Sequence, residues 1–144
     1  DVESGSLKRY EPELGCTLGE ALLEPTRIYV KPVLAMLKAA RVSAVSHITG
    51  GGFYENIPRS LAEGMTARIE RSAVRVLPIF EIIAREGGIP ERDMFNTFNM
   101  GVGMCLTVAA EDVDLALDSL ADAGENGAYA LGEIVRGEGG IELC

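Results

Sequence analysis

Metal-ligating and positively charged side chains are scarce in this sequence. Its three cysteines, Cys16, Cys105 and Cys144, lie far apart and form no Cys-x-x-Cys pair, so they indicate neither a disulfide framework nor a thiolate metal site. His47 is the only histidine, and we expect no metal site in this chain. Thirteen Lys and Arg face 22 Asp and Glu, giving a net charge of −9. This balance argues against nucleic acid and anionic membranes as partners, because both bind basic surfaces.

Long apolar runs are also absent. No stretch approaches the roughly 20 apolar residues of a membrane-spanning helix, and the polar start is unlike a signal peptide. We therefore expect no membrane segment and a cytoplasmic location. Apolar residues still make up 47% of the 144 residues, with a mean hydropathy of +0.16. That proportion is enough to build the core of one globular domain of ordinary size.

The two ends of the chain differ from those of a typical complete protein. Residues 1–11 begin without Met and are rich in Glu, Ser, Gly and Lys, so they are interpreted as a linker-like start to a domain over 12–144. The last residues, GGIELC, alternate as a strand does and stop at Cys144. We expect a piece of a longer protein, truncated at its N-terminal side. A complete domain trimmed at its ends is the alternative.

Hydrophobic periodicity predicts an α+β fold, a mixed β-sheet covered by helices. A helix starting at Thr17, a plausible cap, is expected to break before Pro25. Further helices are expected at 30–40, from the glycines to 61, and at 76–88, 90–98 and 111–124, with strands at 41–48, 65–71, 101–109, 128–135 and 140–144. We expect the last two strands to pair as a hairpin around a turn at 137–140.

Residues 47–58, HITGGGFYENIP, place three glycines between a predicted strand and a predicted helix. Such a turn presents free backbone N–H groups, and Gly50, Gly51 and Gly52 leave room for a phosphate oxygen to approach the main chain. Thr49 adds a hydroxyl and Asn56 an amide. The spacing matches neither a Walker A loop nor a Rossmann fingerprint. The alternatives are an anion-binding loop and a tight strand-to-helix turn without a ligand.

His47 is expected at the end of the preceding strand, beside this loop. Its unperturbed pKa of about 6.5 would suit a general base or a phosphate donor. A hydrogen-bonded structural histidine is the alternative. Arg27, within PTRIYV at 25–30, has a fork that suits a phosphate or a carboxylate.

A second glycine-containing segment, FNMGVGM at 98–104, precedes or enters a strand. Gly101 and Gly103 are two residues apart, so within a strand they would open the same face to a ligand or to another backbone. Asn99 is expected to adopt a left-handed conformation or to donate from its side chain. A β-bulge without a ligand is the alternative interpretation.

Three stretches in this order, LLEPTRIYVKPVL, HITGGGFYENIPRSL and TFNMGVGM, resemble the C-terminal half of the phosphoribosylformylglycinamidine cyclo-ligase family, also called aminoimidazole ribonucleotide synthetases. The resemblance runs from about residue 12 to the last predicted strand. It implies conversion of formylglycinamidine ribonucleotide and ATP to aminoimidazole ribonucleotide, ADP and phosphate in purine biosynthesis. In the family's scheme ATP activates the formyl oxygen, and an amidine nitrogen then closes the imidazole ring.

The resemblance also implies what this chain lacks. Family members are about twice as long, and their N-terminal domain carries most of the ATP-binding and Mg²⁺-binding residues and most of a homodimer interface. The first strand and helix of the C-terminal domain are also missing here. The glycine turn faces the cleft between the two domains in the family, which implies that Thr49 to Gly52 cradle a phosphate beside His47.

Three functions are therefore carried forward. The first is the C-terminal part of a cyclo-ligase, which we expect to be inactive alone. The second is a sibling of the same superfamily with formylglycinamide ribonucleotide amidotransferase chemistry. The third is a non-catalytic α+β module that binds a small anion.

Overall fold

The computed structural model describes residues 5–144, so the first four residues of the linker-like start lie outside it. The α-helices are α1 (Leu18–Leu22), α2 (Val30–Ala39), α3 (Gly52–Asn56), α4 (Pro78–Gly87), α5 (Glu91–Thr97) and α6 (Val113–Asp122). The strands are β1 (Tyr10–Glu11), β2 (Cys16–Thr17), β3 (Val42–His47), β4 (Met65–Ile69), β5 (Met104–Val108), β6 (Gly132–Arg136) and β7 (Ile141–Leu143). Short 3₁₀ turns lie at η2 (Ser6–Lys8), η3 (Pro58–Ser60), η4 (Arg71–Ala73) and η5 (Ala110–Asp112).

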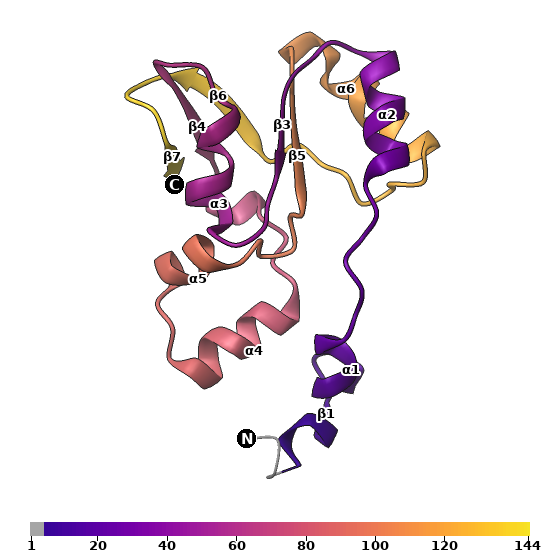
Figure 1. The fold of residues 1–144 in the computed structure, drawn as a ribbon, viewed down its shortest axis with the longest axis vertical. Coiled ribbons are helices and arrows are strands. Elements are labelled where there is room, and N and C mark those ends of the chain that lie inside the picture. Colours follow the sequence, from indigo (N-terminus) through magenta and orange to yellow (C-terminus); the bar gives the residue numbers. More distant parts are fainter. Residues whose placement is uncertain (1–4) are drawn as a thin grey trace.

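The strands form three small sheets. Two are antiparallel pairs, β1 with β2 and β3 with β5. The third has the order β6-β4-β7 and is mixed, because β4 runs antiparallel to β6 and parallel to β7. In Figure 1 the β3–β5 pair stands between α2 and α6 on one side and α3 with the mixed sheet on the other. The α+β class is confirmed, with the strands divided among several sheets.

The N-terminal elements lie at the opposite end of the molecule from α6 and contact α4 (Figure 1). Arg85 of α4 pairs with Glu13 in the β1–β2 turn at 3.1 Å. Thr17 caps α1 through a capping box with Glu20, so the predicted start of this helix is confirmed. Hydrogen bonds from Thr17 lower the pKa of the Glu20 carboxyl.

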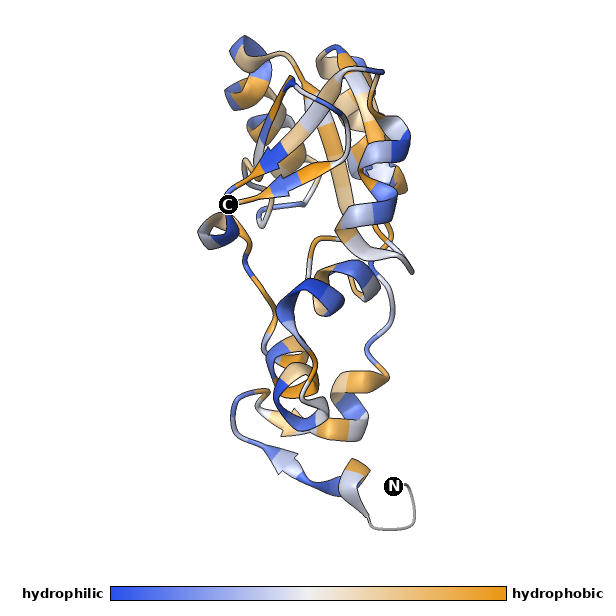
Figure 2. Cartoon of the chain, turned by 90° about the vertical axis from the view of Figure 1, so that its left-hand side faces the viewer, coloured by the Kyte–Doolittle hydropathy of each residue, from blue (hydrophilic) through white to orange (hydrophobic). Residues whose placement is uncertain are grey.

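The largest group of buried side chains joins α3, α5, β4 and the loops beside them. Phe53 and Phe95 are fully buried and meet edge to face with ring centroids 5.1 Å apart. Ile48, Ile69 and Met100 complete the same cluster. Figure 2 shows that apolar residues recur along the whole length of the molecule, including α1 and α4. The core therefore holds α3, and the glycine loop before it, in a fixed place.

The final two strands differ from the expected hairpin. β6 and β7 do not pair with each other, because β4 lies between them and bonds to both. Thr66 of β4 holds the connection between them, since its hydroxyl oxygen accepts from the Gly139 N–H and lies 3.1 Å from the Gly139 carbonyl. The two predicted strands are therefore present, but the prediction that they pair with each other was wrong. Alternation reports which face of a strand is buried and does not report its neighbour.

Helix predictions were confirmed in number and differ in detail. α4 ends at Gly87 and is followed by the cap Gly88 with φ +60°, as the predicted glycine stop requires. The helix expected to reach residue 61 ends at Asn56 and continues only as η3. In α2 the buried residues are Pro32 and Met36, whereas the apolar Leu34 and Leu37 are about half exposed.

No helix among residues 5–144 is both long and apolar enough to cross a membrane.

Candidate functional site

His47 is the last residue of β3, as the sequence predicts, and its side chain is exposed. It lies opposite Met104 in the β3–β5 pair, and the next N–H, that of Ile48, donates to the Gly103 carbonyl at 2.9 Å. The imidazole meets the Tyr29 ring at 6.0 Å between centroids and an interplanar angle of 66°. The strand pairing thus fixes His47 beside the segment that leads into α2.

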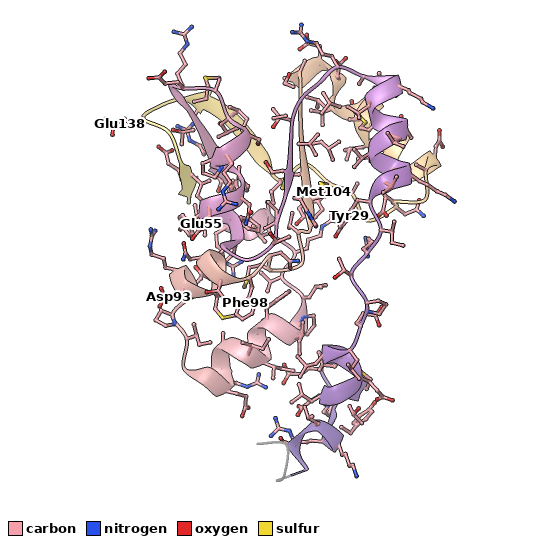
Figure 3. All side chains as sticks on the ribbon, in the orientation of Figure 1. Tyr29, Glu55, Asp93, Phe98, Met104 and Glu138 are labelled. Atoms are coloured by element: carbon pink, nitrogen blue, oxygen red, sulfur yellow. The ribbon has the colours of Figure 1, made fainter. Side chains whose placement is uncertain are left out.

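An open groove of about 470 Å³ lies between these elements. It is lined by Thr26, Arg27, Ile28, Tyr29, Val30, Val33, Leu34, His47 and Met104. Figure 3 shows Tyr29 and Met104 close together between the β3–β5 pair and the start of α2. A volume of this size matches the lower half of the range of small-molecule sites. The groove therefore contains two of the predicted site residues, His47 and Arg27.

Some polar side chains of the groove already interact with other groups of this chain. Arg27 forms an ion pair with Glu125 at 3.0 Å, so its fork is directed at a carboxylate of this chain. Burial raises the pKa of the Tyr29 hydroxyl, against the lowering effect of the Arg27 charge. Tyr29 is therefore a neutral phenol at physiological pH. Its hydroxyl lies so close to Gly103 that a side chain at that position would collide with it.

The glycine loop follows His47 directly. Gly51 has φ +93° and Gly52 has φ +55°, conformations that favour glycine. Gly52 is buried, and a Cβ there would collide with the Phe95 carbonyl oxygen. Gly50 is exposed, and a Cβ there would meet nothing within 4 Å. The loop is thus packed on α5 at Gly52 and open to solvent at Gly50.

Asn56 lies beneath this loop and is 7% exposed. Its side-chain NH₂ group donates toward the carbonyls of Thr49 at 3.3 Å, Gly50 at 3.2 Å and Gly52 at 2.7 Å. The amide oxygen accepts from Arg59 at 3.4 Å. Asn56 is therefore near the predicted position, with its amide donor turned toward the main chain of the loop.

Glu55 is a site neighbour that the sequence analysis did not identify. Its carboxylate lies close to Gly51, because a Cβ built on that glycine would come within 2.6 Å of Glu55 Oε2. Arg59 pairs with this oxygen at 3.1 Å. Figure 3 places the Glu55 side chain on α3. The spacing of Glu55 and Arg59, four residues apart in a helix-like segment, was the available signal for this pair.

The segment at 98–104 differs from its prediction in two ways. The positive φ values fall on Met100 (+52°) and Gly101 (+102°), not on Asn99, whose side-chain oxygen accepts from the Gly101 N–H at 2.9 Å. Strand β5 begins only at Met104, so Gly101 and Gly103 precede it and do not share a strand face. A Cβ at Gly103 would collide with the Tyr29 hydroxyl beside the groove, whereas a Cβ at Gly101 would meet Leu77 and the Arg75 carbonyl.

The candidate residues therefore divide between neighbouring places. His47 and Arg27 line the groove, and Gly103 lies against Tyr29 beside it. The loop that follows His47 comprises Thr49, Gly50, Gly51 and Gly52, with Asn56 beneath it. Asn99 and Gly101 hold a turn beside Leu77. Among residues 5–144 no group of three or more His, Cys, Asp or Glu could hold a metal ion. Burial raises the pKa of Cys105 to about 12, so this thiol is not an available nucleophile.

Known proteins resemble this chain over nearly its full length. The family model described as AIR synthase related protein, C-terminal domain, matches residues 3–143. A phosphoribosylformylglycinamidine cyclo-ligase of Agathobacter rectalis is 50% identical over 143 residues, which cover 99% of this chain and 42% of the relative. A relative of the same name from Caldicellulosiruptor saccharolyticus is 49% identical, over 94% of this chain and 39% of its own length. Another, from Lachnoclostridium phytofermentans, is 50% identical, over 99% of this chain and 42% of its own length.

These relatives are more than twice as long as the part they share with the chain, which spans about two fifths of their length. The family model, in contrast, matches all but three residues of this chain, two at its start and one at its end. The chain therefore belongs to the family of AIR synthase related proteins, as the C-terminal domain of that family.

Proposed function

We propose that this chain forms the C-terminal part of an ATP-dependent cyclo-ligase that converts formylglycinamidine ribonucleotide to aminoimidazole ribonucleotide. One observation carries the proposal: about half of the residues are identical, along 99% of the chain, to a relative that bears the cyclo-ligase name. The amidotransferase-like sibling and the non-catalytic anion-binding module are not favoured, since the named relatives are all cyclo-ligases.

The proposal divides the work between two parts of a longer enzyme. ATP and Mg²⁺ would be held mostly by the part of the relatives that this chain does not span, and we assign the homodimer contacts to the same part. Activation of the formyl oxygen by ATP and attack of the amidine nitrogen then require both parts. In this division the present chain supplies a loop and a groove to one side of the active site, within a cytoplasmic enzyme.

We assign phosphate binding to Thr49, Gly50, Gly51 and Gly52. Thr49 and Gly50 are exposed and Gly51 is half-buried, and within residues 5–144 the N–H groups of Gly50 and Gly51 donate to no protein group. Unpaired N–H groups in a glycine-rich turn are suitable donors to a phosphate. The negative charge of the Glu55 carboxylate would repel an anion bound at Gly51. The ion pair between Glu55 and Arg59 reduces this repulsion.

The groove residues complete the proposed substrate site. His47 lies where the loop meets the groove. It would act there as a general base or as a hydrogen-bonded structural residue. Arg27 would contact substrate only by exchanging its Glu125 partner. Gly103, Gly101 and Asn99 are assigned supporting positions on the neighbouring turn.

The phosphate assignment is tested with Gly51→Val. The valine side chain would collide with the Glu55 side chain beside the loop and strain a residue at φ +93°, so phosphate affinity should fall by tenfold or more, roughly the loss of one charge-assisted hydrogen bond. Gly64→Val is the control for backbone strain, because Gly64 also has a positive φ, +75°, and lies outside the loop. Equal phosphate affinity in wild type and in folded Gly51→Val protein would contradict the assignment.

The activity itself is tested by exchange of domains. In the Agathobacter rectalis relative, the matching C-terminal part is replaced by this chain, and the chimaera is expressed in a strain that lacks its own cyclo-ligase. We expect growth without added purine. The same relative without any C-terminal part is the control and should not support growth. A chimaera that is expressed and folded but fails to restore growth would contradict the proposal.

A further inference from the structure

Glu125 neutralises the positive charge at the wall of the groove. Among the residues that line the groove, Arg27 is the one Arg or Lys. Its Nη1 group donates to Oε2 of Glu125 at 3.0 Å. The Arg27 side chain is 65% exposed and the Glu125 side chain 21% exposed. The guanidinium that lines the groove is therefore paired with a carboxylate of its own chain and is still open to solvent.

The end of α6 fixes the place of this carboxylate. Gly124 has φ +96°, and its N–H donates to the Ala121 carbonyl at 2.9 Å. The N–H of Glu125 donates to the Leu120 carbonyl at 2.8 Å. These two bonds form a Schellman motif, which closes a helix with a left-handed glycine. The carboxylate is therefore anchored through its main chain, whereas its partner extends from residues 24–29, which form no helix or strand.

Both charges of the ion pair act inside the groove, at the Tyr29 hydroxyl. Burial is the main cause that raises the pKa of this hydroxyl, while the Arg27 charge lowers it and the Glu125 charge raises it. Two opposite charges that act on the same group partly cancel there. The intact pair therefore gives the groove little net attraction for an anion.

An exposed ion pair of this kind is readily exchanged, because water and salt screen it and it contributes little to stability. A phosphate monoester is a stronger competitor for a guanidinium than a carboxylate is. It carries about −1.5 to −2 charges at neutral pH and binds the guanidinium fork through two oxygens. A phosphate group can therefore displace Glu125 where a monocarboxylate or an uncharged ligand cannot.

From these observations we infer that Glu125 is a specificity-determining residue of the groove, which pairs with Arg27 until a phosphate monoester displaces it. The inference rests on the proposed function, in which both substrates carry phosphate and the glycine loop takes one phosphate group. It adds a second phosphate contact, on the groove side of His47. The apolar walls at Val33 and Met104 suit the uncharged part of the same ligand.

The test is a titration of the 144-residue chain with ribose 5-phosphate, followed by the NMR signals of Arg27 and Tyr29. In wild type we expect saturable shifts, and no comparable shifts with ribose or acetate. Glu125→Gln removes the competing charge and should bind ribose 5-phosphate about three- to tenfold more tightly. Its affinity should also fall more steeply with salt, because the guanidinium charge is then uncompensated. Arg27→Gln should bind at least about tenfold more weakly than wild type.

Glu13→Gln is the matched control for loss of an exposed ion pair. Glu13 pairs with Arg85 at 3.1 Å, both side chains are about half exposed, and neither lines the groove. This variant should bind ribose 5-phosphate as wild type does. A further measurement needs no substitution: the ¹³C carboxyl signal of Glu125 should shift as ribose 5-phosphate saturates the wild-type chain, and that of Glu13 should stay in place.

The outcomes separate the inference from the proposed function. Equal or weaker affinity in folded Glu125→Gln would overturn the inference and leave Glu125 as a fastening of the irregular segment. So would an unmoved Glu125 carboxyl signal at saturation, which decides the matter if the variant does not fold. Absence of binding at Arg27 in wild type, or acetate binding as tight as that of ribose 5-phosphate, would overturn it as well. The proposed function is judged by growth with the chimaera, which none of these titrations measures.

Discussion

At the residue scale, the three consecutive glycines have different structural roles. Gly52 is buried with a positive φ and touches the Phe95 carbonyl, so a side chain there meets main-chain atoms that cannot move aside. Gly50 is exposed, has an ordinary φ and is surrounded by open space. One glycine therefore serves packing, whereas the other leaves the main chain accessible.

We predict that Gly52→Ala lowers the free energy of unfolding by about 2–4 kcal/mol, from backbone strain and overpacking together. Gly50→Ala should change it by less than about 0.5 kcal/mol. Urea denaturation of the two variants measures the difference. Similar stabilities would show that the contact between Gly52 and α5 does not constrain the loop.

Some of the site was predictable from residue types and some was not. The position of His47 at a strand end and the glycine turn after it follow from local pattern, and both are found. The positive φ of Met100 was not predictable, because a long apolar side chain rarely adopts it. Nor was the direction of the Asn56 amide, which depends on loop carbonyls whose orientation no residue type encodes.

At the scale of elements, local signals predicted the helices better than the sheets. The Thr17 capping box and the Gly88 stop mark helix ends within a few residues of sequence. The mixed sheet instead joins β4 to β7, about 70 residues later in the chain. The alternation of apolar and polar residues in a strand does not indicate which strand it pairs with. Thr66 supplies part of the missing information through its side chain, which bonds Gly139 on the connection to β7.

We predict that Thr66→Val destabilises the chain by about 1–3 kcal/mol, because the shape is kept and the buried hydrogen bonds are lost. Hydrogen exchange should quicken first at Cys144, whose N–H donates to Ile69 at the end of β7. Thr107→Val in β5 is the control, since the Thr107 hydroxyl makes no hydrogen bond within the described chain. Equal effects of the two substitutions would contradict the role given to Thr66.

At the scale of the whole molecule, a large part of the apolar surface is uncovered. Val30, Leu34 and Leu37 recur on α2 at helical spacing and are 61%, 52% and 51% exposed. The β3–β5 pair also has no third strand within residues 5–144. The sequence predicts a helix over 30–40, but which of its apolar positions are covered depends on what packs there, and α2 packs chiefly on α6 among the described helices.

Exposed apolar positions and open strand edges favour association. We predict that the 144-residue chain self-associates as its concentration rises, and that replacing Leu34 and Leu37 together by Lys reduces this association. Light scattering over a range of concentrations measures it. A strictly monomeric chain with cooperative melting at high temperature would contradict the prediction.

The central claim is that this chain supplies one part of a cyclo-ligase active site, and the most direct measurement is product formation by purified proteins. Formylglycinamidine ribonucleotide, ATP and Mg²⁺ are given to the chain alone, to the chimaera with the Agathobacter rectalis N-terminal part, and to the chimaera carrying Gly51→Val. The account predicts aminoimidazole ribonucleotide only from the chimaeras, with at least a tenfold lower kcat/KM for Gly51→Val, roughly one lost charge-assisted hydrogen bond. Turnover by the chain alone, or none by a folded wild-type chimaera, would contradict it.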